Sequence, residues 1–307
     1  MRTPQLYPRS FPAPGERIAV LREVDAIAQD KASGLFAHPE KVHRLDHHGR
    51  FFRSRGPFTV PRSPQGRPVI IQAGQSGRGK RFGAQWGELI FVIYPNIAVA
   101  KRDYAGFKAE VAGCGRNPEH VKITHLITTV AAASRMEAED KWAFIDKLPL
   151  EIDALSLLSE ALNFDFSTKG MDESFTDEEM AAISGLQAIR DRVVRASGKK
   201  NPTVRDFMHH TGRGRVHDPI VGGPKEICDQ LEQWFVEHAC DGFVVSATHV
   251  PGAYEDFVRF VVPELQRRGL FRTEYAGKTL RENLGLPVPS AAASRELRGQ
   301  QQQDGVG

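Results

Sequence analysis

Several features are scarce in this sequence of 307 residues, and each scarcity excludes a class of protein. No stretch reaches the roughly 18 consecutive apolar residues that a helix needs to cross a bilayer. Charge of one sign is also lacking, because 41 Lys and Arg against 38 Asp and Glu leave a formal net charge of +3. So small a charge gives no indication of nucleic-acid binding. Neither a membrane nor a nucleic acid is therefore an expected partner.

Cysteine is rare as well, with only Cys114, Cys228 and Cys240. An odd count at these spacings fits neither a disulfide framework, a zinc site nor a redox pair. We therefore expect free thiols in a reducing, cytoplasmic compartment. Hydrophobic residues are not scarce: at 40 % of the chain they suffice for a sizeable core.

The two ends of the chain lack the regular apolar pattern of its middle. Residues 1–24 contain prolines and arginines but no apolar stretch of a secretory signal, and we expect an irregular segment there. Residues 287–307 are mostly small and polar, and they predict a flexible tail. The folded domain is then expected at residues 25–286.

Between these ends, short apolar runs alternate with amphipathic segments, which is typical of an α/β fold. Strands are predicted near 68–73, 88–93, 121–127 and 242–246. The first is apolar on both faces, as a parallel strand covered on both sides should be. The segment after the second strand has Ala100, Tyr104, Phe107 and Val111 at helical spacing. We therefore predict four strand–helix units, with the strands as parallel neighbours in one curved sheet.

The stretch from about 136 to 207 departs from this alternation. Its apolar residues recur at helical spacing, and a polar segment at Ser167–Asp177 interrupts them. Because it is too long for a single strand–helix connection, we predict a helical insertion that sits largely apart. After it, Gly222-Gly223-Pro224 begins a helix, with Pro224 at the first helical position. Ile227, Leu231 and Phe235 are the predicted buried face of that helix.

The turn after the first predicted strand has the features of an anion site. It reads Gln72-Ala-Gly-Gln-Ser-Gly-Arg-Gly-Lys80. Where a parallel strand leads into a helix, backbone N–H groups face outward and the helix dipole favours an anion. Glycines let a phosphate approach the backbone, and Ser76 adds a hydroxyl donor. From spacing alone, a phosphate site and an ordinary glycine-rich turn are equally good interpretations.

Two phosphate-binding motifs can be compared with this turn. Gly74 to Lys80 matches most of a nucleoside triphosphatase P-loop, but Arg81 stands where Ser or Thr should bind magnesium. The dinucleotide fingerprint fails too, because Gly74, Gly77 and Gly79 are not spaced G-x-G-x-x-G. A P-loop-like nucleotide binder is therefore the weaker alternative.

Histidines could carry chemistry at two further places. Those between His38 and His48 cluster around Asp46 without the spacing of metal ligands, so no metal site is predicted. His249 directly follows the last predicted strand, and active sites of barrels lie at the C-terminal ends of strands. No Ser-His-Asp or Cys-His arrangement is legible, and no catalytic residue is assigned.

Three blocks of sequence together resemble a known family. The first runs from Lys41-Val-His-Arg-Leu-Asp-His47 to Gln72-Ala-Gly-Gln-Ser76, the second is Val221–Ile227 with Asp241-Gly-Phe243, and the third is Val262–Tyr275 with Thr279-Leu-Arg-Glu-Asn-Leu-Gly285. They resemble the luciferase-like flavin monooxygenases, in the branch of nitrilotriacetate monooxygenase component A, dibenzothiophene-sulfone monooxygenase and the pristinamycin synthase large subunit. The likeness extends from about Asp25 to Pro287.

The resemblance implies a (β/α)8 barrel with an insertion, and an enzyme that oxygenates a small organic substrate with O2 and reduced FMN (FMNH2). It also implies a separate NAD(P)H-dependent flavin reductase as the FMNH2 donor. By the same resemblance, Gly74, Gln75, Ser76 and Gly77 hold the FMN phosphate, in agreement with the interpretation as an anion site. The continuation Arg78-Gly79-Lys80 departs from the family pattern.

The resemblance also indicates what this chain lacks. In the family, the strands that form the flavin-ring pocket and supply the catalytic His and Tyr should precede Asp25, and residues 1–24 do not match them. We therefore expect only the C-terminal half of the barrel, with four strand–helix units. An open half-barrel exposes strand edges, so a homo-oligomer is expected. A truncated, inactive monooxygenase and a non-catalytic remnant with weak phosphate or flavin binding are the alternatives to an active enzyme.

Overall fold

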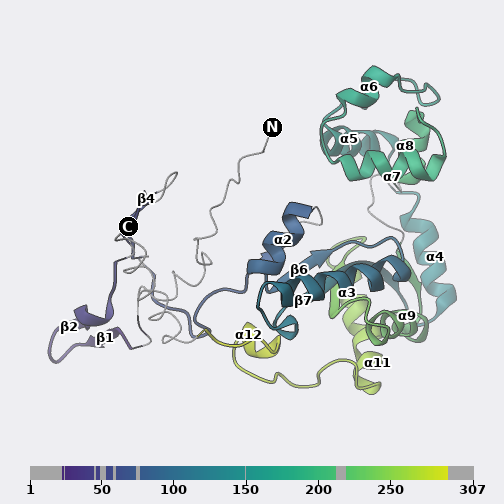
Figure 1. The fold of residues 1–307 in the computed structure, drawn as a ribbon. Helices are drawn as coiled ribbons and strands as arrows, with labels where there is room; N and C mark the ends of the chain where they lie inside the picture. The colour runs from purple at the N-terminus through teal and green to yellow at the C-terminus, as the bar shows by residue number, and fades with distance from the viewer. Residues whose placement is uncertain are drawn as a thin grey trace. The chain divides into compact units, whose positions relative to one another are not determined.

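The computed structural model describes most of the chain between residues 23 and 289. The described residues are 23, 25–44, 46–48, 53–57, 60–73, 77–148, 150–211 and 219–289. The chain divides into two compact units: unit 1 comprises Met1–Val92, Arg102–Thr124 and Glu274–Gly307, and unit 2 comprises Ile93–Lys101 and His125–Thr273. Figure 1 shows the helices and strands, coloured along the chain. Among the described residues, no helix is both long and apolar enough to cross a bilayer.

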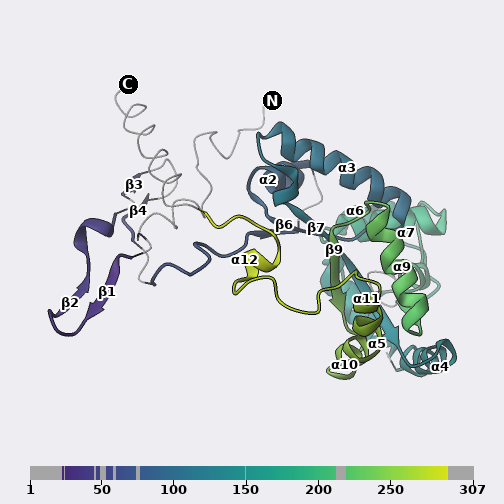
Figure 2. The ribbon, with the colours of Figure 1, turned by 90° about the horizontal axis from the view of Figure 1, so that it is seen from below.

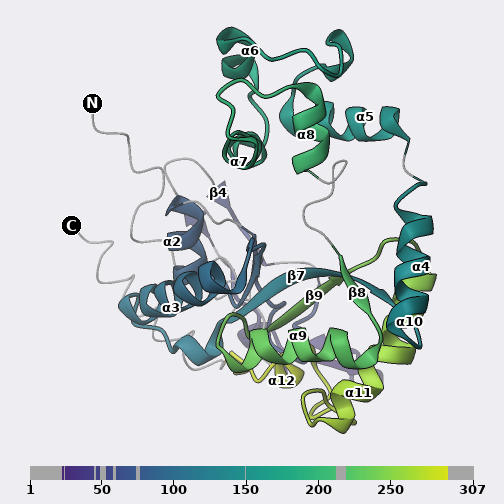
Figure 3. The same ribbon diagram turned by 90° about the vertical axis from the view of Figure 1, so that its right-hand side faces the viewer.

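Within the described part of the chain, one five-stranded sheet contains the predicted strands. Its order is β5 (Ile71–Gln72), β6 (Leu89–Val92), β7 (Lys122–Ala131) and β8 (Ile220–Gly222), and β9 (Gly242–Ser246) also pairs with β7. β5 is parallel to β6, with Ile71 opposite Leu89, and β7 is parallel to β8, with Thr129 opposite Ile220. Figure 3 shows β7, β8 and β9 together. The predicted α/β fold is confirmed.

Three of the four predicted strands lie at the expected apolar runs. The remaining one, β5, is the first of the four in the chain and is shorter than expected. β6 and β9 match 88–93 and 242–246, and β7 extends beyond 127 to Ala131. β5 keeps only two residues of 68–73. The reason is that Pro68 has no N–H to donate, and the N–H of Ile70 donates to the Glu88 carboxylate at 3.1 Å. β8 was not predicted, since three residues are too few to show a period.

Helices follow these strands along the chain. They are α2 (Gly77–Trp86), α3 (Ile97–Gly113), α4 (Arg135–Ile145), α9 (Pro224–Val236), α10 (Gly252–Asp256), α11 (Val262–Arg267) and α12 (Leu280–Asn283), with the short turns η1 (Pro39–Lys41), η2 (Pro118–His120) and η4 (Phe257–Val261). As predicted, α3 buries Ala100, Phe107 and Val111. The predicted start of α9 at Pro224 is also confirmed.

In unit 2, strand β7 and helix α9 share a core. It consists of Ile127, Ala131, Ile227, Cys228, Leu231, Val261 and Leu265. Phe235 was expected on the buried face of α9 but is 47 % exposed. The neighbouring Trp234 takes the inward position at this turn of the helix, where its ring stacks on that of His125 in β7.

The helical residues 252–267 form an interrupted helix rather than a continuous one. Helices α10 and α11 are joined by η4, a π-turn. Pro263 accounts for the interruption, because it has no N–H for the regular bond to the preceding turn. Of the apolar residues in these three segments, Val261 and Leu265 are buried, whereas Tyr254 and Val258 are exposed.

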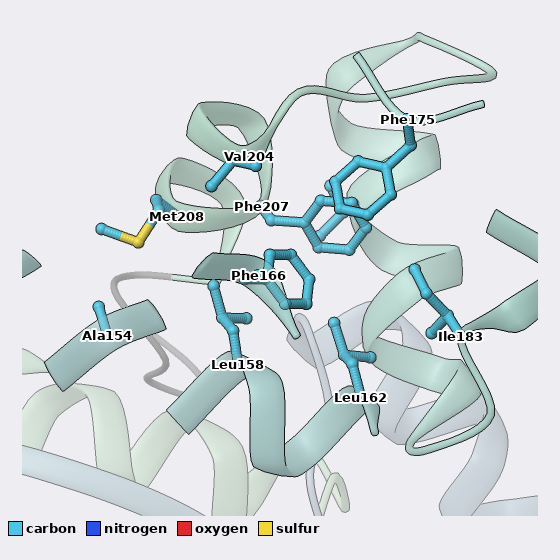
Figure 4. Packing of buried hydrophobic residues seen from close by; sticks show 10 residues of the cluster. Ala154, Leu158, Leu162, Phe166, Phe175, Ile183, Val204, Phe207 and Met208 are labelled. Atoms are coloured by element: carbon cyan, nitrogen blue, oxygen red, sulfur yellow. The ribbon is translucent and has the colours of Figure 1, made fainter. Parts of the chain in front are cut away.

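The chain between residues 151 and 210 forms a group of helices with a core of its own (Figure 4). Its elements are α5 (Glu151–Leu162), η3 (Phe166–Thr168), α6 (Asp177–Ala182), α7 (Gln187–Ser197) and α8 (Val204–His210). Phe166, Phe175 and Phe207 meet in this core with ring centroids 5.4, 5.2 and 5.1 Å apart. The polar segment Ser167–Asp177 therefore contributes a buried side chain, that of Phe175, to the core. That these helices belong to an insertion at about 136–207 stays a prediction.

Two short hairpins precede the sheet. β1 (Ile27–Asp30) pairs with β2 (Leu35–Ala37), and β3 (His47–His48) pairs with β4 (Arg53–Ser54), both antiparallel. Figure 2 shows β1 and β2 in purple. The predicted irregular segment 1–24 and tail 287–307 lie almost wholly outside the described residues and stay predictions.

Candidate functional site

The predicted anion site lies between β5 and α2. Strand β5 ends at Gln72 and helix α2 begins at Gly77, so the strand and the helix on either side of the glycine-rich sequence lie as expected. Gly77 is the first residue of α2. Gly74, Gln75 and Ser76, the other three predicted phosphate ligands, lie outside the described residues.

The first turn of α2 carries positive charge and has no carboxylate of its own. It contains no acidic residue, and Arg78, Lys80 and Arg81 follow Gly77 in sequence. The guanidinium of Arg81 folds back along the helix, and its Nη1 lies 3.9 Å from the position of a Cβ on Gly77. Backbone N–H groups at a helix N-terminus already favour an anion. This set of donors fits a dianionic phosphate such as that of FMN.

Two glycines let α2 pack closely on the strands below it. A Cβ on Gly83 would lie 2.9 Å from Oε1 of Gln72 and 3.3 Å from side-chain atoms of Ile90 and Phe107. A Cβ on Gly87 would lie 2.5 Å from Cδ1 of Ile90. The Oε1 atom of Gln72 is buried, and none of the described residues donates a hydrogen bond to it. An alanine at either position would force neighbouring side chains, those of Gln72 and Ile90 first, to shift.

Arg67, Glu88 and Arg281 form a buried cluster of charges. Arg67 lies shortly before β5 in sequence and Glu88 directly before β6, whereas Arg281 belongs to α12. Both oxygens of the Glu88 carboxylate accept hydrogen bonds from Arg67, at 2.7 and 2.8 Å, and from Arg281 of α12, at 2.9 and 2.6 Å. Burial alone would raise the pKa of Glu88. The hydrogen bonds from Arg281 and from the Ile70 N–H, together with the charge of Arg67, outweigh burial and hold this pKa below its usual value.

The sequence singled out the segment Thr279–Gly285 but gave no role to this cluster. Arg67 and Glu88 were not among the predicted site residues. The available signal was a carboxylate directly before the apolar run Leu89–Val92, which places a charge at the buried end of a strand. A single sequence could not show that its partner would come from Arg281, 193 residues away.

His249 lies one short loop after β9, as its position in the sequence predicts. Its Nδ1 is 3.1 Å from Oγ1 of Thr248. A Cβ on Gly252 would lie 2.6 Å from its Nε2, so the ring rests against the backbone of that glycine. The imidazole is exposed. Among the described residues, no group of three or more His, Cys, Asp or Glu side chains is placed to hold a metal ion.

Comparisons with known proteins extend these observations. Residues 11–241 match the model of the luciferase-like monooxygenase family. The chain is 40 % identical to the dibenzothiophene-sulfone monooxygenase of Rhodococcus erythropolis, over 86 % of this chain and 59 % of that protein. It is 37 % identical to nitrilotriacetate monooxygenase component A of Aminobacter aminovorans, over 89 % of this chain and 60 % of that protein.

A solved structure shows the same fold. The crystal structure of a riboflavin lyase with modified FMN and its substrate riboflavin has a TM-score of 0.76 and 30 % identity, over 93 % of this chain and 62 % of that chain. The predicted α/β fold of the barrel type is confirmed by this similarity. The chain spans about three fifths of the length of the two relatives. That it contains only the C-terminal half of a barrel stays a prediction.

Proposed function

This chain belongs to the luciferase-like monooxygenase family, and we propose that it is the oxygenating component of a two-component monooxygenase. In this proposal a separate NAD(P)H-dependent flavin reductase supplies FMNH2, and a small organic molecule is the substrate. The two relatives named above are monooxygenases, and the name "component A" indicates a system of more than one component. These names support the proposal without naming the substrate of this chain.

The observation that carries the proposal is the positive first turn of α2. Gly77 leaves room for a phosphate, and Arg81 folds back toward it from the next turn. We assign the FMN phosphate to Gly74, Gln75, Ser76 and Gly77. Bound in its reduced form, FMN would supply the electrons that activate O2. The role of the chain at this point is to hold the phosphate and to balance its charge with Arg81 and Lys80.

Three further features belong to the same proposal. A cytoplasmic location agrees with the cysteines, since Cys114, Cys228 and Cys240 are free thiols. A homo-oligomer is proposed on the ground that exposed strand edges favour association. The catalytic residues are left unassigned.

The test is to titrate FMN and riboflavin into the protein and to follow flavin fluorescence. FMN should bind more tightly than riboflavin, because the two differ only in the phosphate. Ser76→Ala should weaken FMN binding by about 0.5–1.5 kcal/mol for the loss of one neutral donor, and Ser76→Thr, which keeps the hydroxyl, should weaken it less. Ser33→Ala, in the turn between β1 and β2, is the matched control. Equal binding of FMN and riboflavin would reject the phosphate site.

A second measurement separates the monooxygenase from the alternatives. The protein is supplied with FMN, NAD(P)H, a flavin reductase and O2, and candidate sulfones and aminopolycarboxylates are analysed for oxygenated products. A product that requires both the reductase and this chain would support the monooxygenase. Tight FMN binding with no product from any candidate would favour the non-catalytic flavin binder.

A further inference from the structure

The segment Thr279–Gly285 buries one charged side chain completely. It forms the short helix α12, and Arg281 in this helix is 0 % exposed. Such burial is unusual, because Arg is almost never fully buried unless it is paired. Arg281 is paired with Glu88, and its other N–H groups donate to main-chain oxygens of Arg67 at 3.1 Å, Pro68 at 3.3 Å and Pro287 at 3.0 Å. A segment from the end of the chain is thereby fastened to the residues directly before β5.

Among the described residues, few main-chain bonds hold the N-terminal side of strand β5 in place. Its ladder with β6 comprises only Ile71 and Gln72. Upstream of them, the carbonyl group of Ile70 accepts main-chain bonds from the N–H groups of Glu88 and of Leu89, the first residue of β6, at 2.9 and 3.1 Å. The Arg281 guanidinium binds the carbonyl groups of the two residues Arg67 and Pro68, and the Glu88 carboxylate that it orients also accepts the Ile70 N–H. Arg281 therefore acts where the sheet supplies few bonds.

Loss of Arg281 would leave several buried groups without partners at once. Of its partners in the described part of the chain, Glu88 would keep Arg67 and the Ile70 N–H, and the carbonyl groups of Arg67 and Pro68 would lose a charged donor. Removing one partner of a buried ion pair is costly, since the remaining charge and dipoles stay out of water. The residues directly before β5 can relieve that cost by moving. Because β5 follows them directly in the chain, it would move with them.

From this geometry we infer that Arg281 is a positioning residue, which places β5 and thereby the first turn of α2 for binding the flavin phosphate. The inference rests on the proposed function of that turn. It assigns to the C-terminal segment Thr279–Pro289 a part in flavin binding, although no residue of that segment was among the predicted ligands. The competing explanation is that Arg281 contributes only to the overall stability of the fold.

Hydrogen exchange of the ligand-free protein separates these two explanations without any flavin. The variants are Arg281→Gln, Arg281→Lys, which keeps the charge but not the planar fork, and the control Arg267→Gln, whose side chain is 71 % exposed. In Arg281→Gln, amides of residues 69–73 and 77–86 should exchange about tenfold faster or more, as expected for the loss of charged hydrogen bonds. Amides of α9 should exchange as in the unmodified protein.

The outcomes of the exchange experiment are decisive in either direction. Faster exchange confined to β5 and α2 supports the inference, with Arg281→Lys between Arg281→Gln and the unmodified protein. Unchanged exchange at β5, or an equal increase in α9, overturns it in favour of a purely stabilising role. Should Arg281→Gln fail to fold, Arg281→Lys carries the same comparison.

A flavin titration then connects this placement to binding. The ratio of the riboflavin Kd to the FMN Kd should fall toward one in Arg281→Gln and stay unchanged in Arg267→Gln. If this ratio falls while the riboflavin Kd stays nearly constant, the result supports the role of Arg281 in positioning the phosphate site. An unchanged ratio overturns that role. If the unmodified protein already has a ratio of one, the proposed phosphate site is wrong, and the exchange data alone still decide whether Arg281 places β5.

Discussion

The imidazole of His125 lies flat on the indole of Trp234, with ring centroids 4.4 Å apart and an angle of 4° between the ring planes. His125 belongs to β7 and is 6 % exposed, and Trp234 belongs to α9. The Nδ1 atom of His125 accepts a hydrogen bond from the N–H of Tyr94 at 3.4 Å. This histidine therefore joins three segments of unit 2, because its ring stacks on those of Trp234 and Tyr94 and its Nδ1 accepts the Tyr94 N–H.

Replacing His125 tests how much this contact contributes to stability. His125→Ala leaves a cavity beside Trp234 and removes the acceptor for the Tyr94 N–H. We expect the free energy of unfolding to fall by about 2–4 kcal/mol, measured by urea denaturation followed by tryptophan fluorescence. His38→Ala, at a surface position, should change it by less than about 0.5 kcal/mol. Equal effects of the two variants would show that the stack contributes nothing specific.

Glu88 should give stability a recognisable dependence on pH. Because its pKa is lowered in the folded state, the contribution of its ion pairs is fully present above the ordinary pKa of 4.5. It is lost as the pH falls through the lowered value. Glu88→Gln should reduce the free energy of unfolding at pH 7 by about 3–5 kcal/mol. The difference between the two proteins should shrink as the pH is lowered from 5, and a difference independent of pH would contradict this account.

Two helical glycines offer a matched pair of substitutions. A Cβ added to Gly83 of α2 would have atoms of Gln72, Ile90 and Phe107 within 3.3 Å, whereas one added to Gly106 of α3 would have nothing within 4 Å. Gly83→Ala should therefore destabilise the protein by about 1–3 kcal/mol through overpacking. Gly106→Ala should stabilise it by about 0.5–1 kcal/mol, since alanine favours a helix. Thermal or urea unfolding of both variants checks the opposite signs.

The core of the helices between 151 and 210 should depend on its phenylalanines. Phe207 is fully buried and contacts the rings of Phe166 and Phe175. Phe207→Ala should cost about 3–5 kcal/mol in the stability of these helices. Phe235→Ala, at a half-exposed position of α9, should cost much less. Hydrogen exchange in α5 and α8 reports the loss locally, and protection unchanged by Phe207→Ala would refute the role of this core.

The α/β class could be predicted from the sequence, because it depends on local patterns. An apolar run such as Leu89–Val92 is typical of a strand in a parallel sheet, because both faces of such a strand are covered. The glycine-rich sequence before Gly77 is also a local pattern, and its assignment to the flavin phosphate stays a proposal. The resemblance to the family depended on such short blocks too, and the match of residues 11–241 confirmed it.

Only the tertiary structure decided which residues far apart in the sequence contact one another. The two-residue length of β5 follows from Pro68 and from the bond between Ile70 and Glu88, and that bond depends on a carboxylate held by Arg281. In the same way, the side chain of Phe235 is exposed because the neighbouring Trp234 stacks on His125. Periodicity describes one element at a time. Which buried charge meets which partner is determined by the packing of several elements, because a charge leaves water only where distant groups together replace its hydration.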